Sequence, residues 1–192
     1  LFNWILGTSD AVAAYQTAGR IEHLFFLPII SVATSLVTLV GMFYGAKRLD
    51  LIRTIIKYGL TRAVAISLSF SILFLFFSGS ILPVFTDSPE IIRLSVLYFK
   101  IMAFAYPFIT IGMTSTRIMQ GLGVAYPIFI LTLFRVVIIS ASLAWYFVMI
   151  LEKPVHYAWV GTLISCILTA AVSLFWLRSI LKRSMKPILE TG

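Results

Sequence analysis

Residues 11–48 read AVAAYQTAGRIEHLFFLPIISVATSLVTLVGMFYGAKR. The stretch begins with polar and ionisable residues, is mainly apolar from Leu24 to Phe43, and closes on Lys47 and Arg48. An apolar run of about 20 residues is long enough to cross about 30 Å of hydrocarbon. A basic pair directly after such a run is typical of its cytoplasmic end. The stretch therefore predicts a membrane-spanning helix whose outer half carries ionisable side chains.

The composition of the whole chain agrees with a membrane protein. Of the 192 residues, 60% are hydrophobic and 11% are charged, whereas a soluble domain has about 25% charged residues. The net charge of +8 comes from Lys and Arg at the ends of apolar runs, which is typical of membrane topology and argues against a nucleic-acid partner. The single cysteine, Cys166, lies in an apolar run and predicts neither a disulfide nor a metal site.

Hydropathy predicts five spans, at residues 11–46, 54–85, 89–120, 125–151 and 156–182. The connections between them are short, so consecutive helices are expected to be antiparallel neighbours. Residues 1–6 are interpreted as the tail of a preceding helix that has been cut off. The predicted fold is an all-α membrane protein, a polytopic helical bundle with five full transmembrane helices plus the tail of a sixth. Residues 1–192 then form a single helical lobe.

The distribution of basic residues predicts the orientation of these helices. One side of the predicted bundle collects most of them: Lys47, Arg48, Arg53, Lys57, Arg62, Arg117, Arg178, Lys182, Arg183 and Lys186. By the positive-inside rule this side is cytoplasmic. Five crossings then place the C-terminus in the cytoplasm.

The first span contains the candidate polar site Gln16, Arg20 and Glu22. Ionisable groups within spans are costly and by default mark function. Gln16 and Arg20, four residues apart, share a helix face, whereas Glu22 points to another face. Either these side chains line a cavity or contact another helix, or they lie above the hydrocarbon and are hydrated. For Glu22 we expect pairing with a neighbour rather than ion coupling.

Arg135 lies about 15 Å from the start of the fourth span. Its long side chain can snorkel to the interface or pair within the bundle, and the functional alternative is a counter-charge for a substrate. Arg117 lies close enough to the cytoplasmic end that snorkelling is expected there.

The third span carries Tyr98, Met102 and Tyr106 at spacings of four residues, so the three side chains share one face. Met and Tyr suit a binding wall for bulky amphipathic ligands, although ordinary helix packing is the alternative. Pro107 removes a backbone hydrogen bond and is the predicted hinge.

Residues 101–151 contain no Asp or Glu. Protonatable carboxylates are the usual ion couplers of transporters, so the coupling acid is expected to be Glu22 or to lie outside this chain. The sequence contains no His-Glu-x-x-His motif, no Gly-rich phosphate loop and no Ser/His/Asp set, and an enzyme is not expected. The two histidines, His23 and His156, are isolated from each other and are not expected to bind a metal.

Several motifs resemble the multidrug and toxic compound extrusion (MATE) family. They are Ala11-Val12-Ala13-Ala14-Tyr15, Gly19-Arg20-Ile21-Glu22, Gly41-x-x-Tyr44-Gly45-Ala46-Lys47-Arg48 and the turn Gln120-Gly121-Leu122-Gly123. The resemblance implies twelve helices in two lobes, of which this chain matches the C-terminal lobe from the tail of helix seven through helix twelve. The implied partners are small organic substrates, the lipid bilayer and the N-terminal lobe of the same polypeptide.

The sequence departs from the family pattern in two places. Met42-Phe43 stands where many members have Gln-Asn, and the third span has no acid after Glu90. The pattern is closer to the branch named for DNA-damage-inducible members, whose proton-linked acid lies in the other lobe.

The resemblance implies an antiporter of the plasma (inner) membrane that exports organic, often cationic, drugs or toxins by alternating access. The coupling ion is H⁺ or Na⁺, with no other cofactor, and its site is expected outside this chain. Two alternatives stay open: a flippase for lipid-linked saccharides of the same superfamily, and a non-transporting membrane scaffold.

Overall fold

The structure is a computed structural model that describes residues 9–146 and 156–190. Every secondary-structure element in these ranges is a helix. The elements are α2 (Ser9–Gly45), α3 (Leu49–Ile81), the 3₁₀ turn η1 (Leu82–Val84), α4 (Pro89–Gly121), α5 (Tyr126–Leu133), the π-helix η2 (Phe134–Ala141), α6 (Ser142–Trp145) and α7 (His156–Glu190).

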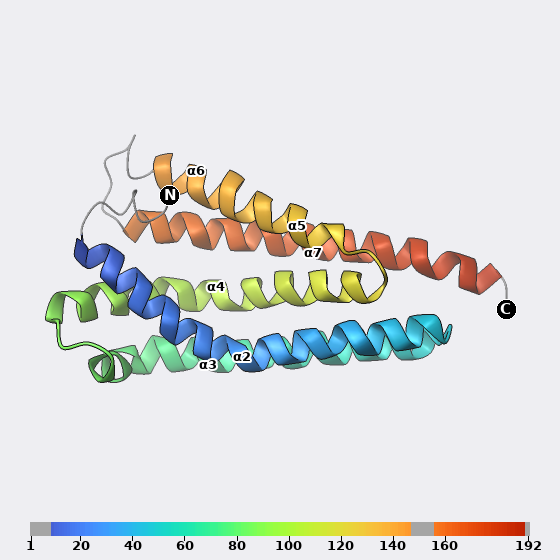
Figure 1. The fold of residues 1–192 in the computed structure, drawn as a ribbon, viewed down its shortest axis with the longest axis horizontal. Helices are drawn as coiled ribbons and strands as arrows, with labels where there is room; N and C mark the ends of the chain where they lie inside the picture. The colour runs from blue at the N-terminus through green and yellow to red at the C-terminus, as the bar shows by residue number, and fades with distance from the viewer. Residues whose placement is uncertain (1–8, 147–155, 191–192) are drawn as a thin grey trace.

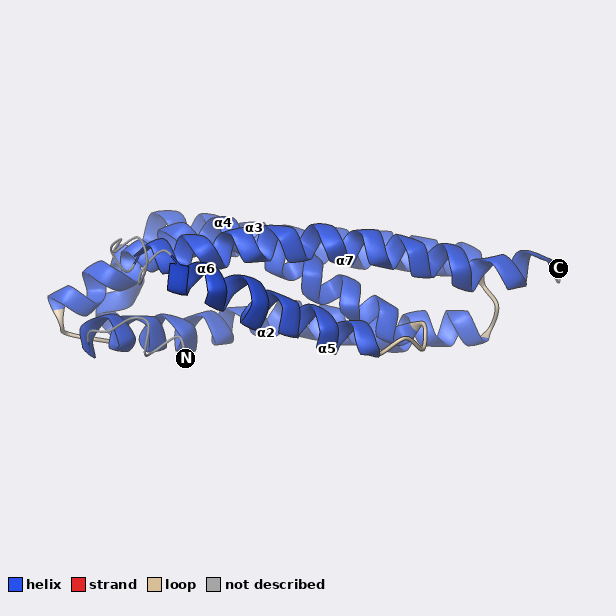
Figure 2. Ribbon diagram, turned by 90° about the horizontal axis from the view of Figure 1, so that it is seen from above, coloured by secondary structure: helices blue, strands red, loops and turns tan. Residues whose placement is uncertain are grey.

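The long helices run side by side along one axis and form an elongated bundle (Figures 1 and 2). The α2–α3 and α4–α5 turns and the end of α7 lie at one end, and the α3–α4 connection lies at the other (Figure 1). The same end of the bundle carries Lys47, Arg48, Arg117, Arg178, Lys182 and Arg183, and we call it the basic end. Helices α2, α4 and α7 point toward it, while α3 and the α5–α6 segment point away.

Helix α4 is the centre of the bundle and packs against α2, α3 and α7. It passes between α7 on one side and α2 with α3 on the other (Figure 1). Many of its positions are buried, including Ser95, Thr110, Gly112 and Ser115. Small and hydroxyl-bearing residues let helix backbones approach closely in a membrane, where no hydrophobic effect drives helices together. The sequence of α4 thus suits a helix covered by protein on several sides.

Two clusters of buried apolar residues fill the interior. One surrounds the aromatic residues Phe74, Tyr98, Phe99, Tyr106 and Trp159. The other lies toward the basic end and is mainly aliphatic: Leu36, Val40, Ile52, Ile56, Ile118, Met119, Leu122, Leu131, Leu177 and Ile180. Large apolar side chains also cover the outside, since Phe76, Phe129 and Phe175 are more than 70% exposed. An apolar exterior is what a bundle in lipid requires.

The described residues contain four helices that are long and apolar enough to cross a membrane, within α2, α3 with η1, α4 and α7. A shorter apolar helix covers Tyr126–Ala141. The prediction of a membrane helix bundle is confirmed. The expected fourth span, 125–151, is broken into α5, η2 and α6, and residues 147–151 lie outside the described residues. The expected helix tail at residues 1–6 also lies outside them.

The second predicted span starts at residue 54, because charged residues before this position lower the hydropathy. Helix α3 begins at Leu49. Its first turn is amphipathic, with Ile52 buried and Arg53 exposed. Burial of one apolar face is enough to extend the helix.

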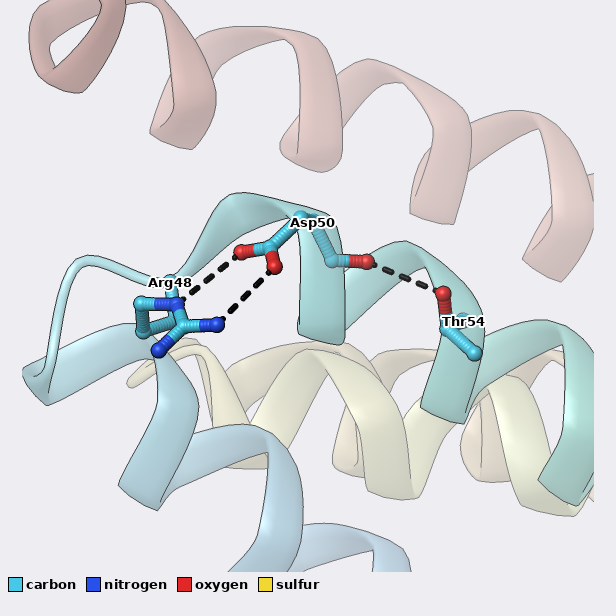
Figure 3. Close-up of polar contacts among 3 residues, drawn as sticks. All are labelled: Arg48, Asp50 and Thr54. Carbon is cyan, nitrogen blue, oxygen red and sulfur yellow. Dashed lines mark hydrogen bonds and ion pairs between the residues drawn. The ribbon is translucent and has the colours of Figure 1, made fainter.

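The turn between α2 and α3 is tight and polar. Lys47 adopts a positive φ of 57°, a conformation that is uncommon for a residue with a side chain. Both nitrogens of Arg48 on one edge of the guanidinium donate to Asp50, at 3.3 and 3.1 Å, and Thr54 donates to the backbone oxygen of Asp50 at 3.0 Å (Figure 3). The Arg48–Asp50 pair is exposed, so its main role is local geometry rather than stability.

The turn between α4 and α5 explains the glycines of the Gln-Gly-Leu-Gly motif. Gly123 has a φ of +85°, which favours glycine. At Gly121 a Cβ atom would lie 2.7 Å from the backbone oxygen of Val37 on α2. The first glycine of the motif therefore permits a close approach of α4 to α2, and the second permits the turn.

We expect Gly121→Ala to lower the free energy of unfolding by about 1–3 kcal/mol, because the added methyl group meets rigid backbone on α2. Gly79→Ala is the matched control, since a Cβ atom there meets nothing within 4 Å, and alanine is the better helix former. The measurement is the thermal unfolding midpoint of the protein in a neutral detergent. Equal midpoints for the two variants would contradict the close approach.

Candidate functional site

The carboxylate of Glu22 on α2 accepts two hydrogen bonds from tyrosines on α4. The hydroxyl of Tyr106 donates to Oε1 at 2.6 Å, and the hydroxyl of Tyr98 donates to Oε2 at 3.0 Å. The tyrosines are eight residues apart and lie on one face of α4, with Met102 buried between them. Hydrogen bonds to an ionised group are stronger than those between neutral groups, so this contact ties α2 to α4 specifically. We call Glu22, Tyr98 and Tyr106 the carboxylate–tyrosine cluster.

Aromatic neighbours hold both tyrosine rings in place. The ring of Tyr98 makes edge-to-face contacts with Tyr15 and Trp159, at centroid distances of 5.7 and 5.4 Å. The ring of Tyr106 makes such a contact with Phe26 at 5.5 Å. Both tyrosines are buried, at 3% and 1% exposure, and each aromatic pair adds about 0.5–1.5 kcal/mol beyond area burial. The hydroxyls are therefore fixed in position before any ligand arrives.

The charge of Glu22 has no cationic partner among the described residues. The ion pairs found in this part of the chain are Arg48–Asp50 and Arg93–Glu90, both exposed. The partners of Glu22 are neutral phenols. The residue as a whole is of intermediate burial, and each carboxylate oxygen accepts one of the two phenol hydrogen bonds. An anionic group with neutral donors and aromatic rings around it is suited to attract a cation.

The structure does not bring Gln16 and Arg20 into this cluster. The face of α2 that packs inward carries Ala14, Ala18 and Ile21, which are at most 2% exposed. Gln16 and Arg20 lie on the exposed side. Their assignment to a substrate pathway stays a prediction, because the two side chains face away from the described part of the bundle.

Two prolines flank the cluster. Pro107 follows Tyr106 directly within α4, and Pro28 lies within α2, six residues after Glu22. Each proline lacks the N–H that would bond to the carbonyl four residues earlier. Both helices continue through these positions, so the hinge role of Pro107 stays a prediction. Pro28 was missed at the sequence level, although its place inside an apolar run was a visible signal.

Arg135 lies on η2 and forms no ion pair with Glu22. Its Nη1 lies 3.9 Å from the sulfur of Cys166 on α7, and its backbone oxygen accepts a hydrogen bond of 3.0 Å from Ser165. A thiol sulfur is a weak acceptor, so the guanidinium is held but not neutralised. Arg135 also lines a cavity of about 230 Å³ between α4, the α5–η2 segment and α7, together with Arg117.

The described residues contain no group of three or more His, Cys, Asp or Glu side chains that are placed to hold a metal ion. His23 is exposed on α2, and the side chain of His156 is outside the described part. Two polar features of the described part of the bundle contain charged side chains, the carboxylate–tyrosine cluster and the arginine-lined cavity, and both are candidates for binding.

Comparisons with known proteins identify the family. A family model described as MatE matches residues 2–146. The chain belongs to the MATE family. This is a family of multi-pass integral membrane transporters rather than enzymes, so the family resemblance predicted from the sequence is confirmed.

Relatives of the chain carry the same assignment. The chain is 23% identical over 175 residues to a probable multidrug resistance protein NorM of Thermotoga maritima, and the match covers 91% of this chain and 38% of that protein. Among solved structures, a MATE transporter in the bent conformation has a TM-score of 0.90 at 23% identity, with 98% of this chain and 42% of that chain covered.

Two further solved structures show the same fold. The MATE transporter ClbM in complex with Rb⁺ has a TM-score of 0.87 at 24% identity, with 97% of this chain and 44% of that chain covered. A MOP superfamily transporter from Pyrococcus furiosus has a TM-score of 0.87 at 23% identity, with 95% of this chain and 42% of that chain covered. The chain thus spans about two fifths of the length of these relatives.

We expect Tyr106→Phe to lower the free energy of unfolding by about 1–3 kcal/mol, because it leaves one oxygen of the Glu22 carboxylate without its donor. Tyr58→Phe is the control, since Tyr58 is 57% exposed and its ring lies against Arg62. Thermal unfolding of the full-length polypeptide measures both variants. If Glu22→Gln and Tyr106→Phe were strictly additive in the double variant, the two groups would not be coupled in solution.

Proposed function

We propose that this chain is the C-terminal lobe of a cation-coupled antiporter that exports organic, often cationic, compounds by alternating access. Family membership and the coverage of about two fifths of each relative support this placement. In this proposal the lobe has five full transmembrane helices plus the tail of a sixth, in a twelve-helix, two-lobe protein of the plasma membrane. The concentration of Lys and Arg at the basic end supports a cytoplasmic C-terminus.

The observation that carries the proposal is the uncompensated carboxylate of Glu22. The sequence favoured pairing of this acid with a neighbour and a coupling site elsewhere. Its partners in the structure are phenols, which orient the carboxyl group but carry no positive charge. Burying a carboxylate without an ion-pair partner in a membrane helix costs free energy, and such residues by default mark a functional site. We therefore assign Glu22 as the group of this lobe that holds the coupling ion or the positive charge of the substrate.

The cluster offers a defined response to each coupling ion. Sodium is bound by oxygen atoms, and the carboxylate and two phenol oxygens supply such ligands. Binding of a proton instead turns one carboxylate oxygen into an O–H donor. This oxygen then faces a phenol hydroxyl that is also a donor. One of the two hydrogen bonds must then change. Because the cluster joins α2 to α4, either event alters the contact between these helices. A relative solved with Rb⁺ supports binding of a monovalent cation in this family.

Alternating access requires that the bound ion favours one conformation, since a ligand with equal affinity for both conformations shifts nothing. Pro107 and Pro28 lie next to the cluster on the two helices that it joins. Missing backbone hydrogen bonds make bending at these points less costly. A change in the hydrogen bonds of Glu22 is therefore placed where both helices bend most easily.

We expect Glu22→Gln in the full-length polypeptide to reduce efflux of a fluorescent organic cation such as ethidium at least tenfold, while the thermal unfolding midpoint stays within a few degrees. The amide keeps the shape of the side chain and removes its charge. Everted membrane vesicles with an imposed proton or sodium gradient provide the measurement. Glu90→Gln is the matched control, because Glu90 is an exposed acid in an ion pair at the start of α4.

Unchanged efflux with Glu22→Gln would refute the role of this carboxylate. Absence of dye efflux in the unmodified protein, with accumulation of lipid-linked saccharides in a deletion strain, would favour the flippase. A scaffold predicts loss of stability on neutralising Glu22 and no gradient-dependent transport in any variant.

A further inference from the structure

The cavity between α4, the α5–η2 segment and α7 has an unbalanced charge. Arg117 and Arg135 line it, and its lining contains no Asp or Glu. Neither arginine has a carboxylate within ion-pair distance among the described residues. Nη1 of Arg117 donates to the amide oxygen of Gln120 at 3.1 Å, and Nη1 of Arg135 faces the sulfur of Cys166 at 3.9 Å. These partners are neutral, so neither of the two positive charges in the cavity is paired with an acid among the described residues.

The two arginines reach the cavity from different helices at neighbouring depths. Arg117 lies four residues before the end of α4, about 6 Å along the axis, and Arg135 lies nine residues after the start of α5, about 14 Å along. The end of α4 and the start of α5, from which these two distances are measured, lie close together because the short α4–α5 turn connects them. The guanidinium groups therefore lie at levels about 8 Å apart, within the half of the bundle next to the basic end.

The backbone at Arg135 is π-helical rather than α-helical. This residue belongs to η2, a π-helical stretch of eight residues. A π-helical turn changes the direction of the side chains relative to a regular α-helix and is frequent at functional sites. The hydrogen bond from Ser165 to the carbonyl of Arg135 holds this turn against α7. The turn thus fixes the position from which the guanidinium enters the cavity.

We propose that this cavity binds an oxyanion, the phosphate or carboxylate head of a small molecule or lipid, between Arg117 and Arg135. The planar guanidinium matches both groups with paired hydrogen bonds. The cavity volume of about 230 Å³ is below the range of about 300–1,000 Å³ for sites that enclose a drug-sized ligand. The cavity therefore takes the anionic head and leaves the remainder of the molecule outside.

This inference goes beyond the exporter function and does not rest on it, because it concerns binding to the resting protein. It also differs in charge from the carboxylate–tyrosine cluster, which is suited to cations. The mouth of the cavity includes Thr132, whose side chain is exposed. A larger side chain at this position narrows the cavity without removing either arginine.

The test uses the full-length polypeptide in a neutral detergent, with the thermal unfolding midpoint followed against added probe. The probes are phosphatidylglycerol, phosphatidylcholine with the same acyl chains, and inorganic phosphate compared with chloride at equal ionic strength. The variants are Arg135→Gln, Arg117→Gln and Thr132→Leu. Arg178→Gln is the control, because Arg178 is exposed on α7 and lies outside the cavity.

We expect phosphatidylglycerol or inorganic phosphate to raise the midpoint, with an apparent affinity that falls at least fivefold in each of the three cavity variants and less than twofold in Arg178→Gln. A response to phosphatidylglycerol alone identifies a lipid source, and a response to inorganic phosphate identifies a free anion. Thr132→Leu keeps the test valid if a glutamine variant fails to fold.

Two results would overturn the proposal. One is the absence of any response to phosphatidylglycerol and phosphate beyond that to phosphatidylcholine and chloride, which would mean that an acid elsewhere in the polypeptide compensates the arginines. The other is an equal loss of response in Arg178→Gln, which would reduce the effect to general surface charge.

Discussion

A charge inside a membrane bundle cannot be stabilised by bulk water, and this constraint accounts for where the polar groups of this chain lie. The complementary pairs Arg48–Asp50 and Arg93–Glu90 are exposed near helix ends, where water and headgroups are within reach. Glu22, farther along α2, is held by two phenols. Arg135, farther along its segment, faces a cavity and a thiol. The deeper charges are thus oriented by neutral groups, and the outer ones are neutralised.

The same constraint governs how the helices pack. Lipid tails are as apolar as the helix surfaces, so association depends on close backbone approach and on hydrogen bonds between helices. Both are visible at α4. Its last residue, Gly121, lies against the backbone of Val37 on α2, and Ser95 donates to the backbone oxygen of Ala14 at 3.2 Å. With the tyrosine bonds to Glu22 between them, these contacts attach α4 to α2 at several levels.

The sequence predicted those features that depend on one helix at a time. Apolar run length revealed the long helices, and the short loops predicted their alternating directions. The spacing of Tyr98, Met102 and Tyr106 placed them on one face, and Glu22 was expected on a different face from Arg20. What a face contacts depends on the rotation and neighbours of each helix, so the partnership of Glu22 with two tyrosines was not predicted. The π-helix was also missed, because Phe134–Ala141 is apolar apart from Arg135 and Ser140, like any membrane helix.

The positions of Glu22 and Arg135 relative to each other carry a final argument. Glu22 lies on α2 and Arg135 on η2, so the acid and the arginine belong to different helices of the same bundle. They nevertheless form no ion pair, and each is held by its own neutral partners. A sequence selected only for stability would pair two opposite charges in one apolar bundle, or replace both with apolar residues, because either change removes uncompensated buried charge. The two proposed binding sites require this separation, because one needs a negative and the other a positive position. Residues that lower stability without structural compensation are expected at functional sites. Among the described residues, Glu22 and Arg135 are two such residues.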